Sequence, residues 1–160
     1  MVQLIPMTKS EYQAFRSRSV REYAEEKVVA GTWKTEDAPA LAEAVFRRFL
    51  PDDQETAGAY LFSVKESEGL TPVGHLWFNV MEQEKGPIAF ILDILIYEEF
   101  QGKGYGQATM TALEEKVREL GLNTIGLHVF GHNQRAYRLY QKMGYAVTDM
   151  QMFKTLEYRG

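Results

Sequence analysis

A glycine-rich stretch at residues 101–106, QGKGYG, constrains the fold more than any other part of this sequence. It follows an apolar run over residues 88–97, bounded by Gly86-Pro87, a pattern typical of a strand buried on both faces. After the glycines, apolar residues recur at helical spacing between positions 110 and 120. The sequence therefore predicts a strand, a glycine loop and a helix in direct succession.

Such a loop has the properties of a phosphate site. Glycine lets a ligand approach the backbone closely, and the start of a helix presents unpaired N–H groups with partial positive charge. The spacing G-x-G-x-G departs from the dinucleotide fingerprint, and a Walker loop is excluded because Gly104 follows Lys103. Three glycines beside a lysine favour phosphate or pyrophosphate binding, and the alternative is a turn that only reverses the chain.

Composition narrows the class of protein further. A chain of 160 residues predicts one domain over residues 1–160. The absence of cysteine excludes a thiol nucleophile and fits a reducing compartment, so we expect a cytoplasmic protein. A net charge of −4 disfavours nucleic acid as the main partner, and no run suggests a signal peptide or a membrane span. Three scattered histidines give no pattern for a metal site.

The remaining apolar patterns predict elements on either side of the glycine loop. Predicted strands cover residues 2–5, 60–64, 73–81, 123–130 and 145–155. Predicted helices begin at a capping box over Thr8–Glu11, at Thr35–Asp37 and at Asn133. In the second of these helices we expect four residues to face inward: Leu41, Val45, Phe46 and Phe49. The two early helices are interpreted either as a lid or as plain scaffold.

The connections between these elements predict the topology. Short turns join the strands at 60–64, 73–81 and 87–97, which indicates an antiparallel meander. The strand at 123–130 is reached through a helix, so it is expected to run parallel to the 87–97 strand. We therefore predict an α/β (α+β) fold with a mixed, mostly antiparallel sheet of six to seven strands and helices on both faces.

A second group of residues follows the predicted strand at 123–130, and its members are Asn133, Ala136, Leu139, Tyr140, Gly144 and Tyr145. Together with the pattern Gln101-x-x-Gly104-x-Gly106, this group resembles the GNAT superfamily of N-acetyltransferases. The order of strands and helices agrees with that family along the whole chain. The N-terminal half matches in element order alone, and in this family that half shapes the acceptor pocket.

The resemblance implies acetyl-CoA as acyl donor and assigns residues to it. Main-chain groups of Ile94, Leu95 and Ile96 would contact the pantetheine amide and the acetyl carbonyl. The pyrophosphate would lie on the loop residues Gln101, Gly102, Lys103, Gly104, Tyr105 and Gly106. Asn133 would bind the pantetheine arm. Glu98 stands where the family often has proline, and we expect it to face solvent.

Tyr140 resembles the tyrosine that lies near the thioester sulfur and acts as general acid. A phenol can protonate a leaving thiolate, and it is neutral at pH 7 without special burial. The alternative for Tyr140 is a core tyrosine completing an apolar stripe, and the alternative for Asn133 is an N-cap. The two roles of Asn133 are compatible with each other.

Two residues are candidates for the general base. Asp93 interrupts an apolar strand, and a buried carboxylate is either paired or has a raised pKa that suits proton removal. Its alternative is a structural carboxylate satisfied by backbone or by His75. His128 titrates in a useful range and occupies a position where some family members carry a base, but a lone strand histidine is also commonly structural. His132 is expected in a loop.

We therefore predict an N-acetyltransferase that transfers the acetyl group of acetyl-CoA directly to a primary amine. The alternatives are a non-catalytic acyl-CoA-binding module of the same fold and a nucleotide-phosphate enzyme, for which no magnesium ligands are evident. The acceptor is a small molecule or a protein amine. Acidic residues near the expected acceptor mouth favour a cation, or form solvated helix ends: Glu25, Glu26, Glu36 and Asp37. The sequence is also compatible with an oligomer.

Overall fold

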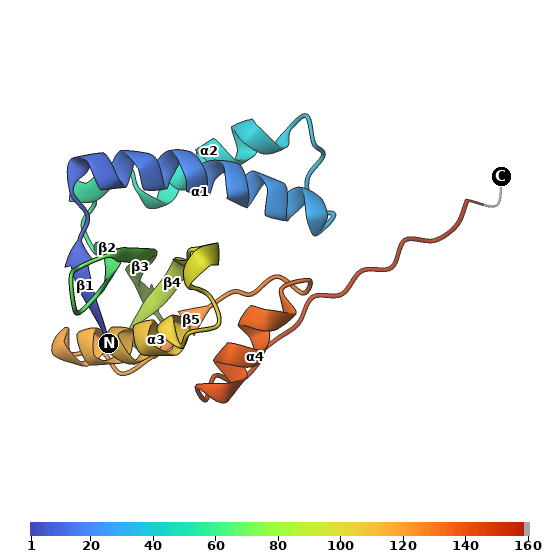
Figure 1. Cartoon of the computed structure of the whole chain (residues 1–160). Helices are drawn as coiled ribbons and strands as arrows, with labels where there is room; N and C mark the ends of the chain where they lie inside the picture. Colours follow the sequence, from blue (N-terminus) through green and yellow to red (C-terminus); the bar gives the residue numbers. More distant parts are fainter. Residues whose placement is uncertain (159–160) are drawn as a thin grey trace.

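The structure, a computed structural model, describes residues 1–158 and is built on one mixed sheet (Figure 1). Its five strands lie in the order in which they occur in the sequence: β1 (Val2–Pro6), β2 (Ala59–Glu66), β3 (Pro72–Gln83), β4 (Gly86–Ile96) and β5 (Ile125–Leu127). The first four pair antiparallel, and β5 pairs parallel to β4. The predicted meander and the predicted parallel strand are both confirmed.

Helices cover both faces of this sheet, as predicted (Figure 1). The helices are α1 (Lys9–Val29), α2 (Ala38–Phe49), α3 (Tyr105–Glu119) and α4 (Gln134–Lys142), and short 3-10 turns occur at η1 (Asp53–Glu55) and η2 (Glu98–Phe100). α1 and α2 lie on one face and α3 on the other, with α4 beside α3. No helix within residues 1–158 is both long enough and apolar enough to cross a membrane.

Successive side chains of β3 point to opposite faces of the sheet, so β3 contributes core residues to both faces. Leu76 and Phe78 face α3, whereas Trp77 packs against Phe15 of α1 and Phe46 of α2. Burial of one such side chain stabilises the fold by about 1.5–3 kcal/mol. Because the inward faces of α1 and α2 belong to this core, the structure favours scaffold over lid for these two helices.

The structure corrects four details of the sequence predictions. Residues 145–155 form no strand, so the sheet has five strands instead of six or seven. β5 is shorter than the predicted strand at 123–130, and β4 is mostly half-buried because β5 covers only part of it. Leu41 is 41% exposed, and the neighbouring Ala42 is buried in its place. The apolar pattern alone did not fix the rotation of α2.

Candidate functional site

The candidate site begins where β4 and β5 separate. Three residue pairs join the two strands in the described chain: Ala89–Ile125, Phe90–Gly126 and Ile91–Leu127. The β3–β4 register shifts directly after them, since Trp77 faces Asp93 and Phe78 faces Ile91, which leaves Leu92 as a bulge. Within residues 1–158, β4 therefore continues beyond Ile91 beside β3 alone, and residues 94–96 have no strand partner on the β5 side. This loss of pairing is called the β4–β5 opening below.

The glycine loop follows this opening and leads directly into α3. Gly102 and Gly104 have φ angles of 78° and 88°, a region that residues with a Cβ rarely adopt. Gly104 is the N-cap of α3 and offers no side-chain hydrogen bond to the first turn. Residues 101–104 are exposed. The N–H groups at the start of α3 are thus accessible to an anion.

The third glycine of the loop serves packing. A Cβ at Gly106 would lie 3.3 Å from Cδ2 of Leu139, a contact tighter than side chains normally make. Gly106 therefore lets α3 approach α4 closely, which brings the helix of Asn133 and Tyr140 against the loop.

Arg135 also lies at the loop, and it is absent from the residues predicted above. Its Nη1 donates to Oε1 of Gln101 at 2.9 Å, and Nε2 of Gln101 donates to the carbonyl of Ile96 at 2.8 Å. Nη2 lies 4.0 Å from where a Cβ of Gly102 would be. A cation in the first turn of a helix opposes the helix dipole. The unfavourable position of Arg135 in the helix is the sequence signal that could have indicated a role in binding.

Asn133 and Tyr140 are carried by α4. The Oδ1 of Asn133 accepts the N–H of Ala136 at 3.2 Å, which confirms the cap, and its amide nitrogen has no protein partner in the described chain. Tyr140 is 9% exposed, and its ring lies 5.8 Å from that of Tyr145. Burial, with the negative charge of Asp93 as the second cause, raises the pKa of Tyr140 to about 12. Its hydroxyl is therefore protonated at neutral pH.

Asp93 lies on the α1 side of β4, opposite Trp77. Its Oδ2 is 3.2 Å from Nε2 of the buried His75, although the geometry between them is not that of a directed hydrogen bond. Both the base role of Asp93 and its structural alternative stay predictions. α1 adds Arg18, which pairs with Glu22 and stacks over Tyr97.

The segment after β5 crosses toward the C-terminal half of α1. His128 is exposed, with its ring against Phe130 at 5.1 Å. Partial burial of the ring and then the charge of Lys27 lower the pKa of His128, so it is neutral at pH 7. His132 lies in the loop as predicted and contacts Glu26. Within residues 1–158, no hydrogen bond or ion pair joins His128 to Asp93 or Tyr140.

Comparison with known proteins identifies the fold. Residues 17–145 match the model of the acetyltransferase (GNAT) family. The chain belongs to this family. It is 40% identical to the uncharacterized N-acetyltransferase YycN of Bacillus subtilis (strain 168), over 97% of this chain and 99% of YycN. It is 37% identical to the uncharacterized N-acetyltransferase YdgE of the same organism, over 94% and 95% of the two chains.

A solved structure agrees with this GNAT assignment. The crystal structure of YycN from Bacillus subtilis superposes with a TM-score of 0.93 at 39% identity, over 99% of this chain and all of that chain. The sequence-based resemblance to the GNAT superfamily is therefore confirmed, and so is its fold.

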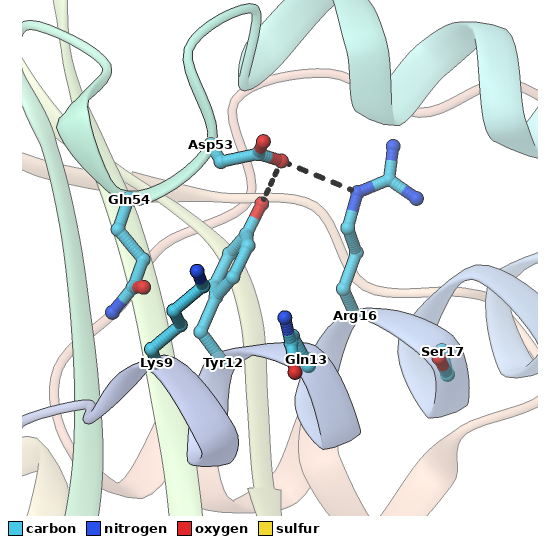
Figure 2. Close-up of a pocket in the computed structure, with 7 residues that line it drawn as sticks. All are labelled: Lys9, Tyr12, Gln13, Arg16, Ser17, Asp53 and Gln54. Atoms are coloured by element: carbon cyan, nitrogen blue, oxygen red, sulfur yellow. Dashed lines mark hydrogen bonds and ion pairs between the residues drawn. The ribbon is translucent and has the colours of Figure 1, made fainter.

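Two hollows of this GNAT protein lie away from the β4–β5 opening. One, of about 260 Å³, is lined by α1 and η1, and Figure 2 shows Tyr12 and Arg16 directed toward Asp53. Tyr12 donates to Asp53 at 2.9 Å, and Arg16 forms an ion pair with Glu43 at 2.8 Å. These contacts leave Tyr12, Arg16 and Asp53 with partners inside the protein. The other hollow, of about 480 Å³, lies at β5.

Proposed function

We propose that this chain is an N-acetyltransferase that uses acetyl-CoA directly on a primary amine. The observation that carries the proposal is that β4 loses its β5 partner after Ile91, shortly before an exposed glycine loop and the uncapped start of α3. In this proposal, residues 1–160 act as a single domain.

The residues around the opening fit acetyl-CoA. Main-chain groups of residues 94–96 would bind the acyl and pantetheine end, and the free amide of Asn133 would bind the pantetheine arm. The N–H groups of residues 101–106 would bind the pyrophosphate, with Arg135 adding positive charge beside them. Bound acetyl-CoA supplies the thioester whose acyl group is transferred.

Tyr140 would protonate the leaving group. In the reaction, the amine nitrogen bonds to the acyl carbon, the carbon–sulfur bond breaks, and the departing thiolate takes up one proton. A phenol with a pKa of about 12 carries that proton throughout the physiological range. Its position in the core also preserves the structural alternative, because Tyr140 packs in the cluster under α3.

The amine must lose a proton, and two residues are proposed to accept it. Asp93 lies at the opening with His75 as its neighbour, so a proton taken up there meets a second titratable group. His128 is neutral at pH 7 and therefore able to accept a proton. Proton removal by either group predicts a rate that rises with pH. If Asp93→Asn and His128→Ala both keep the wild-type pH profile, water performs this step.

A panel of amines assayed for release of CoA tests the function. We expect acetyl-CoA to bind and at least one cationic amine to cause CoA release well above the hydrolysis rate. The panel should include polyamines, amino sugars and peptides with free N-termini or lysines. Tight binding of acetyl-CoA without turnover on any amine would support the non-catalytic module instead. An absence of binding would overturn both.

A further inference from the structure

Three aromatic rings surround the ammonium group of Lys27. Its Nζ lies 5.4 Å from the ring centre of Trp33, 5.6 Å from that of Tyr23 and 5.9 Å from that of Phe130. The negative face of an aromatic ring attracts a cation at this range. Within residues 1–158, Lys27 forms no ion pair with a carboxylate. We call Tyr23, Trp33 and Phe130 the aromatic cage.

The aromatic cage is built from three parts of the chain. Tyr23 and Lys27 lie one turn apart on α1, Trp33 lies in the connection from α1 to α2, and Phe130 lies in the segment after β5. Tyr23 packs edge-on against Trp33 at 5.7 Å and against Phe46 of α2 at 6.0 Å. The N–H of Trp33 donates to the carbonyl of Lys27 at 3.3 Å. Two walls of the cage are therefore fixed to the helices.

His132 holds the third wall in place. Its ring stacks on that of Phe130, with 5.5 Å between the ring centres and 19° between the planes. Its Nε2 contacts Oε2 of Glu26 on α1. These contacts connect the segment after β5 to α1, which is far away in the sequence. A site whose walls are already in position loses less conformational freedom when a ligand binds.

The aromatic cage adjoins residues proposed for the reaction. The ring of Phe130 lies 5.1 Å from that of His128, a proposed base, and Asn133 follows in the same segment. Phe130 thus contacts both His128 and the ammonium of Lys27. A second cationic group of the acceptor would therefore reach the cage from the side of the proposed base.

Lys27 indicates which ligand chemistry the cage accepts. Its side chain ends in an alkylammonium group, which carries three donors and no acceptor. The side chain is long, flexible and half-buried, so it can leave the cage and be hydrated in solvent. A ligand with an alkylammonium group would then take its place between the same three rings.

We propose that the aromatic cage binds an alkylammonium group of the acceptor, remote from the amine that is acetylated, and that the acceptor displaces Lys27 from it. The acceptor class is thus an amine with at least one further cationic group. This inference rests on the proposed acetyl transfer for the role of the ligand, but binding to the cage is measurable without turnover.

The indole N–H resonances of the full-length protein test binding to the cage. The chain has two tryptophans, and Trp77 is the internal reference because it is 2% exposed and donates its indole N–H to Asn79 at 2.7 Å. We expect spermidine to shift the resonance of Trp33 and to leave that of Trp77 in place. Titration with a peptide containing two lysines shows whether a small polyamine or a lysine side chain binds more tightly. A Trp33 resonance that neither titrant shifts would overturn the proposal.

Replacing Lys27 tests its displacement. Lys27→Ala empties the cage and should raise the affinity for spermidine by about three- to tenfold. Lys34→Ala removes the same charge from the exposed lysine beside Trp33 and should leave the affinity unchanged. Lys27→Arg keeps a cation in the cage and should give no gain. Circular dichroism confirms that the variants fold. An unchanged or lower affinity in Lys27→Ala would contradict displacement.

Turnover separates this inference from the proposed function. Trp33→Leu removes one wall of the cage and should raise the KM for spermidine by about three- to tenfold. The KM for butylamine should not change, because its single amine is the one that reacts. An equal KM for spermidine in the wild type and in Trp33→Leu, with CoA still released, would overturn the inference and leave the proposed function intact. Spermidine binding at Trp33 without CoA release from any amine would instead contradict the proposed function.

Discussion

α1 and α3 differ in whether side chains cap their N-termini. α1 begins with a complete capping box, in which the side chain of Thr8 accepts the N–H of Glu11 and Glu11 accepts the N–H of Thr8. α3 begins at Gly104, which has no side chain to cap the first turn. A capped start stabilises a helix by about 1 kcal/mol, so α3 forgoes that stabilisation and leaves its N–H groups free.

The same contrast holds for the two sides of the sheet. On the α1 side, polar groups near the surface satisfy one another, as Tyr12 does with Asp53 and Arg16 does with Glu43. On the α3–α4 side, the amide of Asn133 and the first-turn N–H groups of α3 have no protein partner within residues 1–158. We infer that the groups around the start of α1 serve stability and that the α3–α4 side binds acetyl-CoA.

Replacing Tyr140 should produce the largest effect on the ligand side. Tyr140→Phe removes one oxygen and keeps the ring in its packed position, so we expect kcat to fall by about 10²–10⁴-fold. The affinity for acetyl-CoA should change by less than about tenfold, and thermal stability should change little. Steady-state kinetics measure kcat, and calorimetry measures the affinity for acetyl-CoA and the melting temperature. A wild-type rate with a lowered melting temperature would identify Tyr140 as a core residue only.

Replacing Gly104 should abolish ligand binding at a modest cost in stability. Its φ of 88° costs a residue with a Cβ about 1–2 kcal/mol, and the new side chain would cover the start of α3. Gly31→Val is the matched control, because Gly31 has a φ of 77° and lies after α1 with open space around it. We expect both variants to lose similar stability, and only Gly104→Val to lose acetyl-CoA binding by calorimetry. Equal affinities of the two variants for acetyl-CoA would contradict a role of the start of α3 in binding.

Replacing Arg135 should weaken binding by less. A charge-assisted hydrogen bond contributes about 1.5–3 kcal/mol, so Arg135→Ala should raise the Kd for CoA by about ten- to a hundredfold. Arg138→Ala, an exposed arginine of the same helix, is the control and should leave the Kd unchanged. Measuring the Kd of both proteins for dephospho-CoA and for pantetheine shows which part of CoA Arg135 contacts. An equal loss for pantetheine, which lacks the pyrophosphate, would show that Arg135 acts elsewhere.

Replacing Thr8 should have the smallest effect, confined to stability. Thr8→Ala removes half of the capping box and should lower the free energy of unfolding by about 1 kcal/mol, or about 2–4 °C in Tm. Thr8→Ser keeps a hydroxyl and should restore most of this loss. Acetyl-CoA affinity should equal that of the wild type in both, as measured by calorimetry. A loss of affinity in Thr8→Ala would show that the α1 side also takes part in binding.

Local chemistry was sufficient to predict most of this fold. The capping box at Thr8, the apolar stripe of α3 and the glycine after α4 each specify an element through contacts close in sequence. The strand predicted at residues 145–155 has the right alternation but no partner in the described chain. A pattern shows that a segment can pair, but it does not show where a partner edge lies.

The candidate site was predictable to the extent that its groups are main-chain or carried by a motif. The loop at residues 101–106 is predicted from its glycine spacing, and the roles of Asn133 and Tyr140 are predicted from the resemblance to the GNAT superfamily. Arg135 does not, because its contact with Gln101 depends on how closely α4 approaches the loop, which the packing of Gly106 against Leu139 determines. The contact between Asp93 and His75 likewise depends on the register of β3 and β4.

Amide hydrogen exchange resolved by NMR tests the central claim most directly. We expect saturating acetyl-CoA to slow exchange and shift the resonances of the N–H groups at residues 102–108, which lie in the loop and the first turn of α3. The first turn of α1, at residues 9–12, should show no change, because its capping box is already complete. Binding of acetyl-CoA that leaves residues 102–108 unprotected, or that protects the start of α1 equally, would contradict the account.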